Sequence, residues 1–232
     1  MASSRLTTLR ILLGLGLIRA GEHVLRAVVA TGSPRSVVFL ALDIVGFARL
    51  GDREQLDRRK WLYTAVDRIQ DSLAGRAAYD VLDRGDGMLV LLPGDTNLIR
   101  LFEESIPDLA DWISDQRGTR MRCALHKGNV QRDHRGWVGK QINIVFRLID
   151  SPLLRKQRKG SDAALLVAMT DAVYREASQC LRDLDEQRYR NLFRKGWASE
   201  AQKVQVQFKE SDFAAWVAPV ASGRHLPDPG LT

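Results

Sequence analysis

A continuous apolar run, Val37–Leu42, predicts a strand that is buried on both of its faces. The run ends on an acid, Asp43, and a carboxylate in that position is costly unless something pairs with it. A second segment, Ala78–Pro93, has two strand-like halves around the sequence RGDG at Arg84–Gly87, which predicts a hairpin. We expect this hairpin to lie beside the first strand and to bring Asp86 close to Asp43.

Spacings of three and four between apolar residues predict a helix over Gln55–Leu73, with Leu56 on the buried stripe and Arg59 among the solvated positions. The charged stretch Asp183–Ala198 is predicted to be a loop. The other predicted elements are a helix at Asn97–Gln116 that Pro107 breaks or restarts, a strand at Arg120–His126, a polar loop or hairpin from Gly128 to Gly136, a helix at Gln141–Gln157, a strand at Ala163–Met169, a helix from Asp171 to about Cys180, and a closing hairpin of Lys203–Phe208 and Phe213–Ala218. This order predicts an α+β fold with a ferredoxin-like split βαβ core, an antiparallel-rich sheet and flanking helices.

Turn-rich segments near both ends of the chain predict three parts. We expect an N-terminal extension at 1–35, one domain at 36–220 and a disordered tail at 221–232. Ile11–Ile18 is faintly similar to a signal-peptide core, but charged residues follow it, which favours a partly helical extension or a start codon placed too early. No segment approaches the roughly 20 apolar residues of a membrane span, so we expect no stable membrane insertion.

Composition narrows the class of partner. The 232 residues are 45% hydrophobic and 27% charged, as in ordinary soluble proteins, and the net charge is +7. A positive charge is consistent with an anionic partner, either nucleic acid or a phosphorylated small molecule. The alternative is a mildly basic surface without functional meaning. The aromatic strand pattern of RNA-binding sheets is missing, so no nucleic-acid partner is expected. Cys123 and Cys180 form no CxxC motif, which favours a cytoplasmic location.

Two converging carboxylates repel each other unless a cation lies between them. Asp43 and Asp86 therefore predict a divalent metal site. The alternative is that Asp43 only caps the helix that follows it.

These residues also carry a resemblance. DIVGF at Asp43–Phe47, the Gly85–Asp86 pair, GKQINIVFR at Gly139–Arg147 and the late Lys209 resemble the class III nucleotidyl cyclase homology domain over about Val37 to Ala218. The resemblance implies that 36–220 is a catalytic domain. It also implies that Asp43, Asp86 and the carbonyl of Ile44 hold two divalent cations, with Mn²⁺ favoured over Mg²⁺. These ions would bind a nucleoside triphosphate and activate its ribose 3′-hydroxyl, which expels pyrophosphate.

The resemblance assigns further roles. Backbone amides of Val45–Phe47, including Gly46 and Phe47, would bind phosphate oxygens, and Lys209 would bind the phosphates as well. Asn143 would position the ribose and Arg147 would stabilise the transition state. The family takes its acids and its Asn/Arg pair from different subunits, which implies a head-to-tail homodimer. Asn143 and Arg147 also fit an ordinary polar helix face, but their apolar neighbours favour a buried one.

Two positions that read adenine in adenylate cyclases are occupied here by Leu82 and, approximately, Gly136. Neither side chain makes a polar contact with a base, which argues against the usual adenine recognition. DRGDGMLVLLP and FKESDFAAWV resemble the bacterial Pycsar pyrimidine cyclases. That resemblance implies that UTP or CTP becomes cyclic UMP or cyclic CMP in anti-phage defence, and that the product activates a separate effector protein. We favour UTP, although no residue selects it.

Two alternatives stay open: a purine cyclase with atypical base contacts, and a nucleotide-binding regulatory module without turnover. Outside the motif set, Arg84 either reaches the substrate or, as we favour, points to water, and His126 is expected to be structural.

Overall fold

The computed structural model describes residues 33–73, 80–116, 118–159, 161–206 and 213–221. These residues belong to two compact units. The larger unit comprises the described residues of Ser36–Gly128 and Lys140–Thr232, and the smaller one comprises Asn129–Gly139 with residues 33–35. Lys209 lies outside the described residues. Almost all residues of the predicted extension and of the predicted tail lie outside them as well.

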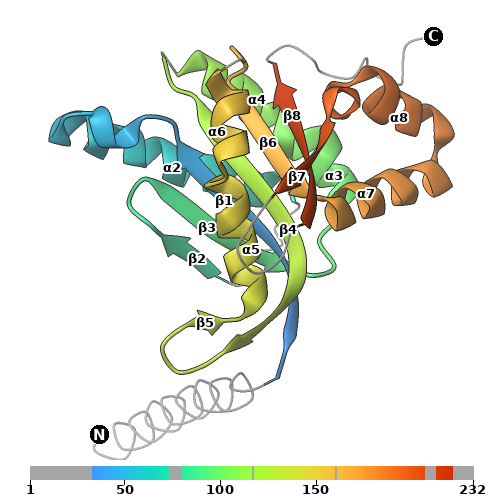
Figure 1. The fold of residues 1–232 in the computed structure, drawn as a ribbon, viewed down its shortest axis with the longest axis horizontal. Coiled ribbons are helices and arrows are strands. Elements are labelled where there is room, and N and C mark those ends of the chain that lie inside the picture. The colour runs from blue at the N-terminus through green and yellow to red at the C-terminus, as the bar shows by residue number, and fades with distance from the viewer. Residues whose placement is uncertain (1–32, 74–79, 117, 160, 207–212, 222–232) are drawn as a thin grey trace, which may run out of the picture. The chain divides into compact units, whose positions relative to one another are not determined.

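The larger unit is built on one sheet with the strand order β2-β3-β1-β4-β6-β8-β7 (Figure 1). Its strands are β1 (Arg35–Ile44), β2 (Asp80–Asp83), β3 (Gly87–Pro93), β4 (Met121–Arg132), β6 (Leu165–Thr170), β7 (Gln202–Val206) and β8 (Phe213–Val220). β3 is antiparallel to β1 and β2, β8 is antiparallel to β6 and β7, and β4 is parallel to β6. The first four strands lie in the order of a ferredoxin-like core, so the predicted α+β fold class is confirmed.

Helices connect these strands. They are α2 (Asp52–Ser72), α3 (Leu98–Arg100), α4 (Ile106–Asp115), α5 (Lys140–Ile149), α6 (Pro152–Lys159), α7 (Asp171–Leu184) and α8 (Glu186–Arg190). After α3 the chain makes a π-helical turn and then enters α4, with Pro107 in the first turn. Proline is tolerated there because backbone N–H groups of the first turn have no hydrogen-bond partner within the helix. Pro152 begins α6 in the same way, which divides the predicted helix at Gln141–Gln157 into two.

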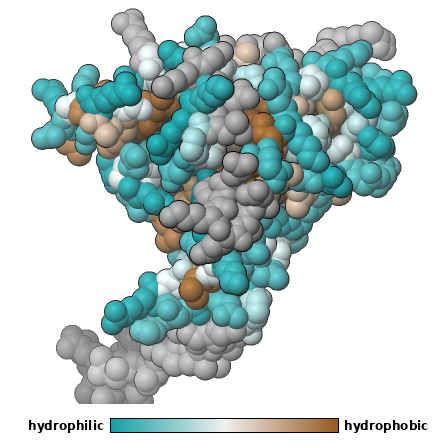
Figure 2. Space-filling model, in the orientation of Figure 1, coloured by the Kyte–Doolittle hydropathy of each residue, from teal (hydrophilic) through white to brown (hydrophobic). Residues whose placement is uncertain are grey.

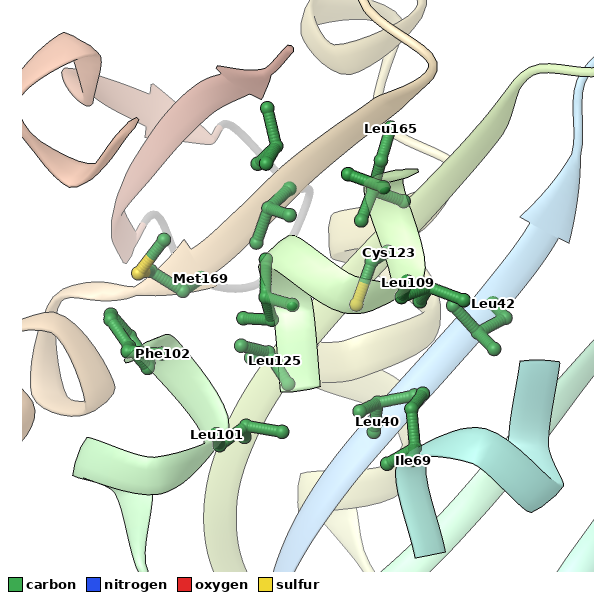
Figure 3. Packing of buried hydrophobic residues seen from close by; sticks show 14 of the residues in the cluster. Leu40, Leu42, Ile69, Leu101, Phe102, Leu109, Cys123, Leu125, Leu165 and Met169 are labelled. Atoms are coloured by element: carbon green, nitrogen blue, oxygen red, sulfur yellow. The ribbon is translucent and has the colours of Figure 1, made fainter. Parts of the chain in front are cut away.

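The main core lies on one face of the sheet, where Figure 3 shows side chains of β1, β4 and β6 meeting those of α2 and α4. Val38, Leu40 and Leu42 of β1 belong to this core, as the period of two along a strand requires. The intervening Phe39 and Ala41 are buried on the other face, where Ala41 shares a cavity with residues of α5. β1 is therefore buried on both faces, as predicted.

The expectation of a loop at Asp183–Ala198 was wrong. This stretch forms α8, a π-helical turn and a 3-10 turn, and it buries Tyr189, Leu192, Phe193 and Trp197. Trp197 donates from its indole Nε1 to the carbonyl of Phe102 at 2.9 Å. The charged residues of the stretch lie mostly on its exposed side. Their number led to the prediction of a loop, although the apolar residues between them are buried.

The buried stripe predicted for Gln55–Leu73 was wrong at one position, because Leu56 is 64% exposed. Leu62, Ala65, Val66 and Ile69 form the stripe that α2 buries. Figure 2 shows hydrophilic residues over much of the visible face, with hydrophobic areas between them. Among the described helices, none is long and apolar enough to cross a membrane.

The smaller unit contains the predicted polar hairpin. The end of β4 pairs with β5 (Trp137–Val138), with Gln131 opposite Val138. Asp133 closes the turn because its carboxylate accepts from the amides of Arg135 and Gly136, each at 2.8 Å. This loop thereby satisfies its own backbone donors.

Candidate active site

The end of β1 and the RGDG turn are joined through their backbones. Asp43 lies opposite Gly87 in the β1–β3 register, and the amide of Ile44 donates to the carbonyl of Asp86 at 3.1 Å. A Cβ at Gly87 would lie 2.5 Å from the carbonyl oxygen of Leu42, so only glycine permits this approach. The structure therefore brings Asp43 and Asp86 to the same end of the sheet, with Asp43 buried and Asp86 exposed.

Three carboxylates line one cavity beside this turn. The cavity, called the acid pocket below, has a volume of about 140 Å³ and includes Asp43 and Asp86 together with Asp150, which follows α5. Arg84 lines it too and places its guanidinium 3.8 Å from the centre of the Phe146 ring. Arg84, expected to point to water, is exposed, and its guanidinium also stacks on Phe146 of α5.

Asp43 forms an ion pair with Arg122 of β4, and each of the two side chains is only 12% exposed. Nη2 of Arg122 donates to Asp43 and Nη1 donates to the carbonyl of Ile149 at 3.0 Å. Nε of the same side chain is buried without a hydrogen-bond partner. The sequence-based prediction did not include Arg122, although an arginine between the apolar residues Met121 and Cys123 of the alternating strand RMRCALH was a usable signal.

The electrostatics of Asp43 follow from this environment. Burial raises the pKa of its carboxyl to about 6, against the positive charge of Arg122, which lowers it. The negative charges of Asp86 and Asp150 raise the pKa further. Repulsion among these acids is the condition that a bound cation relieves.

The donors at this site suit a hard divalent cation. The carboxylates of Asp43 and Asp86 and the carbonyl of Ile44 are oxygen groups of the kind that such a cation prefers. In the described part of the chain, no group of three or more His, Cys, Asp or Glu side chains is arranged to hold a metal. Two carboxylates and one carbonyl would leave several coordination positions of a divalent cation to water or substrate oxygens.

The RGDG turn is held by α2. Nη1 of Arg59 donates to the carbonyl of Gly85 at 2.7 Å, and Arg59 also pairs with Asp83. Asp83 accepts from the amide of Gly85 at 2.8 Å and from the hydroxyl of Tyr63 at 2.9 Å. Gly85 has φ of +89°, which favours glycine. Arg59, expected to be solvated, is therefore a support of the turn, since its side chain is only 26% exposed.

The turn after β1 differs in part from the expected phosphate cradle. The amide of Val45 donates to the carbonyl of Arg120 at 3.0 Å, so the expectation that it faces a phosphate was wrong for this conformation. Gly46 has φ of +79° and lies at the edge of a second cavity. Phe47 is half-buried and packs against the core.

Asn143 and Arg147 lie on α5, and neither of them lines the acid pocket. The buried face of this helix consists of Ile142, Val145, Leu148 and Ile149. Arg147 is half-buried, whereas Asn143 is exposed, so the expectation of a buried polar face was wrong for Asn143. The structure brings together Asp43, Ile44 and Asp86, but not the Asn/Arg pair of the same chain.

The structure also places the two positions linked to base recognition. Leu82 is half-buried on β2, opposite Leu89, and Gly136 lies in the β4–β5 hairpin of the smaller unit.

His126, expected to be structural, is buried. Its ring lies 5.8 Å from that of Phe39, and its Nδ1 lies 3.1 Å from Oγ1 of Thr170.

Comparison with known proteins supports the fold. No protein-family model and no curated protein sequence matches the chain. Among solved structures, it is similar to the catalytic core of a rhodopsin-guanylyl cyclase with converted specificity in complex with ATPαS, at 16% identity and a TM-score of 0.53, over 81% of this chain and 98% of that one. An adenylate/guanylate cyclase/hydrolase from Silicibacter pomeroyi gives 16% identity and 0.51, over 81% and 98%.

A third similar structure is the guanylyl cyclase Cya2, at 16% identity and a TM-score of 0.50, over 84% of this chain and 98% of that one. The mixed sheet with flanking helices described above matches the fold of these catalytic domains. The chain therefore has the class III nucleotidyl cyclase fold.

Proposed function

We propose that this protein is a nucleotidyl cyclase that converts a nucleoside 5′-triphosphate into a 3′,5′-cyclic nucleotide and pyrophosphate. One observation carries the proposal: within a cyclase fold, the β1–β3 pairing brings the two acids Asp43 and Asp86 to one strand end, where Ile44 follows Asp43 and hydrogen-bonds to the backbone of Asp86. The fold alone would not support it, because one fold hosts many functions.

Each residue of this strand end has a role in the proposed reaction. Asp43, Asp86 and the carbonyl of Ile44 hold divalent cations, with Mn²⁺ favoured over Mg²⁺. When bound, such cations neutralise phosphate charge and make the ribose 3′-hydroxyl a better nucleophile. Arg122 orients Asp43 and carries a positive charge beside it, where phosphate oxygens gain negative charge in the reaction.

The proposal includes a second copy of the chain. Asn143 and Arg147 do not line the acid pocket of their own chain, and Asn143 is exposed. A head-to-tail homodimer would let these side chains complete the site of the other copy, with Asn143 positioning the ribose and Arg147 stabilising the transition state. Lys209 would bind the phosphates. One chain carries both halves, so two equal sites would form.

The proposed base is a pyrimidine, UTP or CTP. Leu82 is half-buried on β2 and offers no polar atom to a base edge, and Gly136 has no side chain. A purine is the alternative, and the known structures favour it: one similar structure is in complex with ATPαS and another, a guanylate cyclase domain from Catenaria anguillulae, is in complex with GTP. The product would act as a messenger on a separate effector protein, in line with the proposed role in anti-phage defence.

The test is incubation of the purified protein with all four nucleoside triphosphates and Mn²⁺, with products separated by chromatography and identified by mass. Cyclic UMP or cyclic CMP supports the whole proposal. Cyclic AMP or cyclic GMP supports the cyclase and refutes the pyrimidine assignment. Nucleotide that binds without forming product in the presence of Mn²⁺ indicates the non-catalytic regulatory module instead.

A further inference from the structure

Arg84 connects the RGDG turn to helix α5. Its amide donates to the carbonyl of Gly87 at 2.9 Å, so its backbone closes the turn. Its guanidinium lies 3.8 Å from the centre of the Phe146 ring, well within the roughly 6 Å over which an aromatic face attracts a cation. Both side chains line the acid pocket. The contact therefore joins the segment that carries Asp86 to a helix that follows much later in the chain.

A second arginine ties the same helix to the other candidate cation ligand. Nη2 of Arg122 donates to Asp43, and Nη1 of the same guanidinium donates to the carbonyl of Ile149, the last residue of α5, at 3.0 Å. The contact of Arg84 with Phe146 lies three positions earlier on the helix. The second half of α5 is thus held at two points by side chains that adjoin the two acids.

The neighbours of Phe146 on α5 are the residues proposed to act in the site of the other copy. Asn143 precedes Phe146 by three positions, which places the two side by side on the helix surface, and Arg147 follows Phe146 directly. Phe146 lines the acid pocket of its own chain, whereas Asn143 and Arg147 do not. One helix therefore contacts its own acid pocket and carries the side chains that the proposed dimer needs in the other site.

We propose that Arg84 is a positioning residue that acts through Phe146 on α5, and thereby on the active site that α5 completes in the other copy. This inference rests on the proposed cyclase activity and its head-to-tail dimer. Loss of the contact removes one of the two ties that fix the second half of α5. A small misplacement of groups that act on the transition state slows the chemical step more than it weakens nucleotide binding. The competing role for Arg84 is direct contact with substrate in the site beside it.

Paired variants isolate the contact. Arg84→Met keeps the length of the side chain without its charge, and Phe146→Leu keeps apolar volume without a ring face. Each should lower kcat about tenfold and leave KM within about twofold, and the double variant should lose no more than either single one. Arg84→Lys and Phe146→Tyr keep a cation and a ring, so they should retain most of the rate. Arg190→Met is the control, because Arg190 is an exposed, ion-paired arginine of α8.

Mixed dimers separate action through α5 from contact with substrate. An Asp86→Asn copy and an Arg147→Ala copy, co-expressed with different tags, form a dimer with one intact site. In that site the Arg147→Ala copy supplies the acids, and the Asp86→Asn copy supplies Asn143 and Arg147. Arg84→Met in the Asp86→Asn copy should lower the rate about tenfold, at least about five times more than the same change in the other copy.

A larger loss with Arg84→Met in the copy that supplies the acids overturns the inference and assigns Arg84 to the substrate of its own site. Equal rates with and without Arg84→Met overturn it as well. Mixed dimers that stay inactive, although the wild type is active, refute the shared sites and the inference with them.

Failure of the proposed function itself is recognised separately, because the wild type then forms no cyclic product. Amide hydrogen exchange over α5 judges the contact in that case. Faster exchange in Arg84→Met and Phe146→Leu than in Arg84→Lys supports the tie between the turn and the helix. Equal exchange in all three variants and the wild type overturns it.

Discussion

Arg59 of α2 donates to the carbonyl oxygen of Gly85 at 2.7 Å, across 26 positions of sequence, and so fixes the turn that carries Asp86. The same guanidinium pairs with Asp83 and donates to the hydroxyl of Tyr63 at 2.8 Å. The candidate metal ligand thus depends for its position on a helix that contributes no ligand itself.

Arg59→Ala should therefore weaken binding of the divalent cation and raise the Mn²⁺ concentration for half-maximal activity by about tenfold. Stability should change little, by about 1 kcal/mol or less, because the ion pair is partly exposed. Lys60→Ala is the matched control, since Lys60 follows on the same helix and pairs only with exposed Asp57 among the described contacts. Equal Mn²⁺ dependence in both variants would remove Arg59 from the support of the site.

Asp86→Asn should abolish turnover, by about a hundredfold or more, because it removes a charged cation ligand worth several kcal/mol in the transition state. Asp86 is exposed at the tip of the turn, so urea unfolding should give the wild-type stability within about 0.5 kcal/mol. Asp67→Asn on the exposed side of α2 is the control and should retain full activity. Turnover that survives in Asp86→Asn contradicts the metal assignment.

Cation binding should depend on pH through Asp43. The deprotonated carboxylate is the ligand, and burial raises its pKa to about 6. Below that pH a proton competes with the cation, so affinity should fall about tenfold per unit; above it, affinity should be level. Mn²⁺ titrations between pH 5 and pH 8, followed by electron paramagnetic resonance, test this. Affinity that is flat down to pH 5 would show that Asp43 is not the titrating ligand.

Phe193→Ala should destabilise the fold by about 3–5 kcal/mol, as expected for removal of a large buried side chain. Phe193 stacks on Phe102 and Tyr189 and contacts Tyr174 edge-on, so several rings lose their partner at once. Urea unfolding measures the loss, with Arg194→Ala next to it as a control at an exposed position. Equal stability of the two variants would place this stretch outside the cooperative core.

The sequence pattern correctly predicted the features that depend on neighbouring residues, namely a buried strand and a hairpin turn. The run Val37–Leu42 and the RGDG hairpin signalled a buried strand beside a turn, and their pairing put Asp43 near Asp86. The inference from apolar sequence neighbours was wrong for Asn143, because successive residues of a helix point to different sides, so apolar neighbours in sequence do not bury the residue between them.

The remaining contacts depend on strand register and on distance in sequence. Arg122 meets Asp43 across 79 positions, and Arg59 meets Gly85 across 26. Residue spacing in the sequence cannot predict such pairs, because they form only when the order of the strands in the sheet and the angle of α2 are fixed. The loop expected at Asp183–Ala198 failed for a related reason: its charges lie outward, and its apolar residues find partners such as Phe102 far away in the sequence.

The pair of Arg122 and Asp43 has one more consequence. Arg122 is the internal counterion of Asp43 in the free protein, although burial outweighs its charge and holds the pKa of Asp43 at about 6. Uptake of a cation at Asp43 is then an exchange of partners, in which the guanidinium gives up part of its hold on one anion.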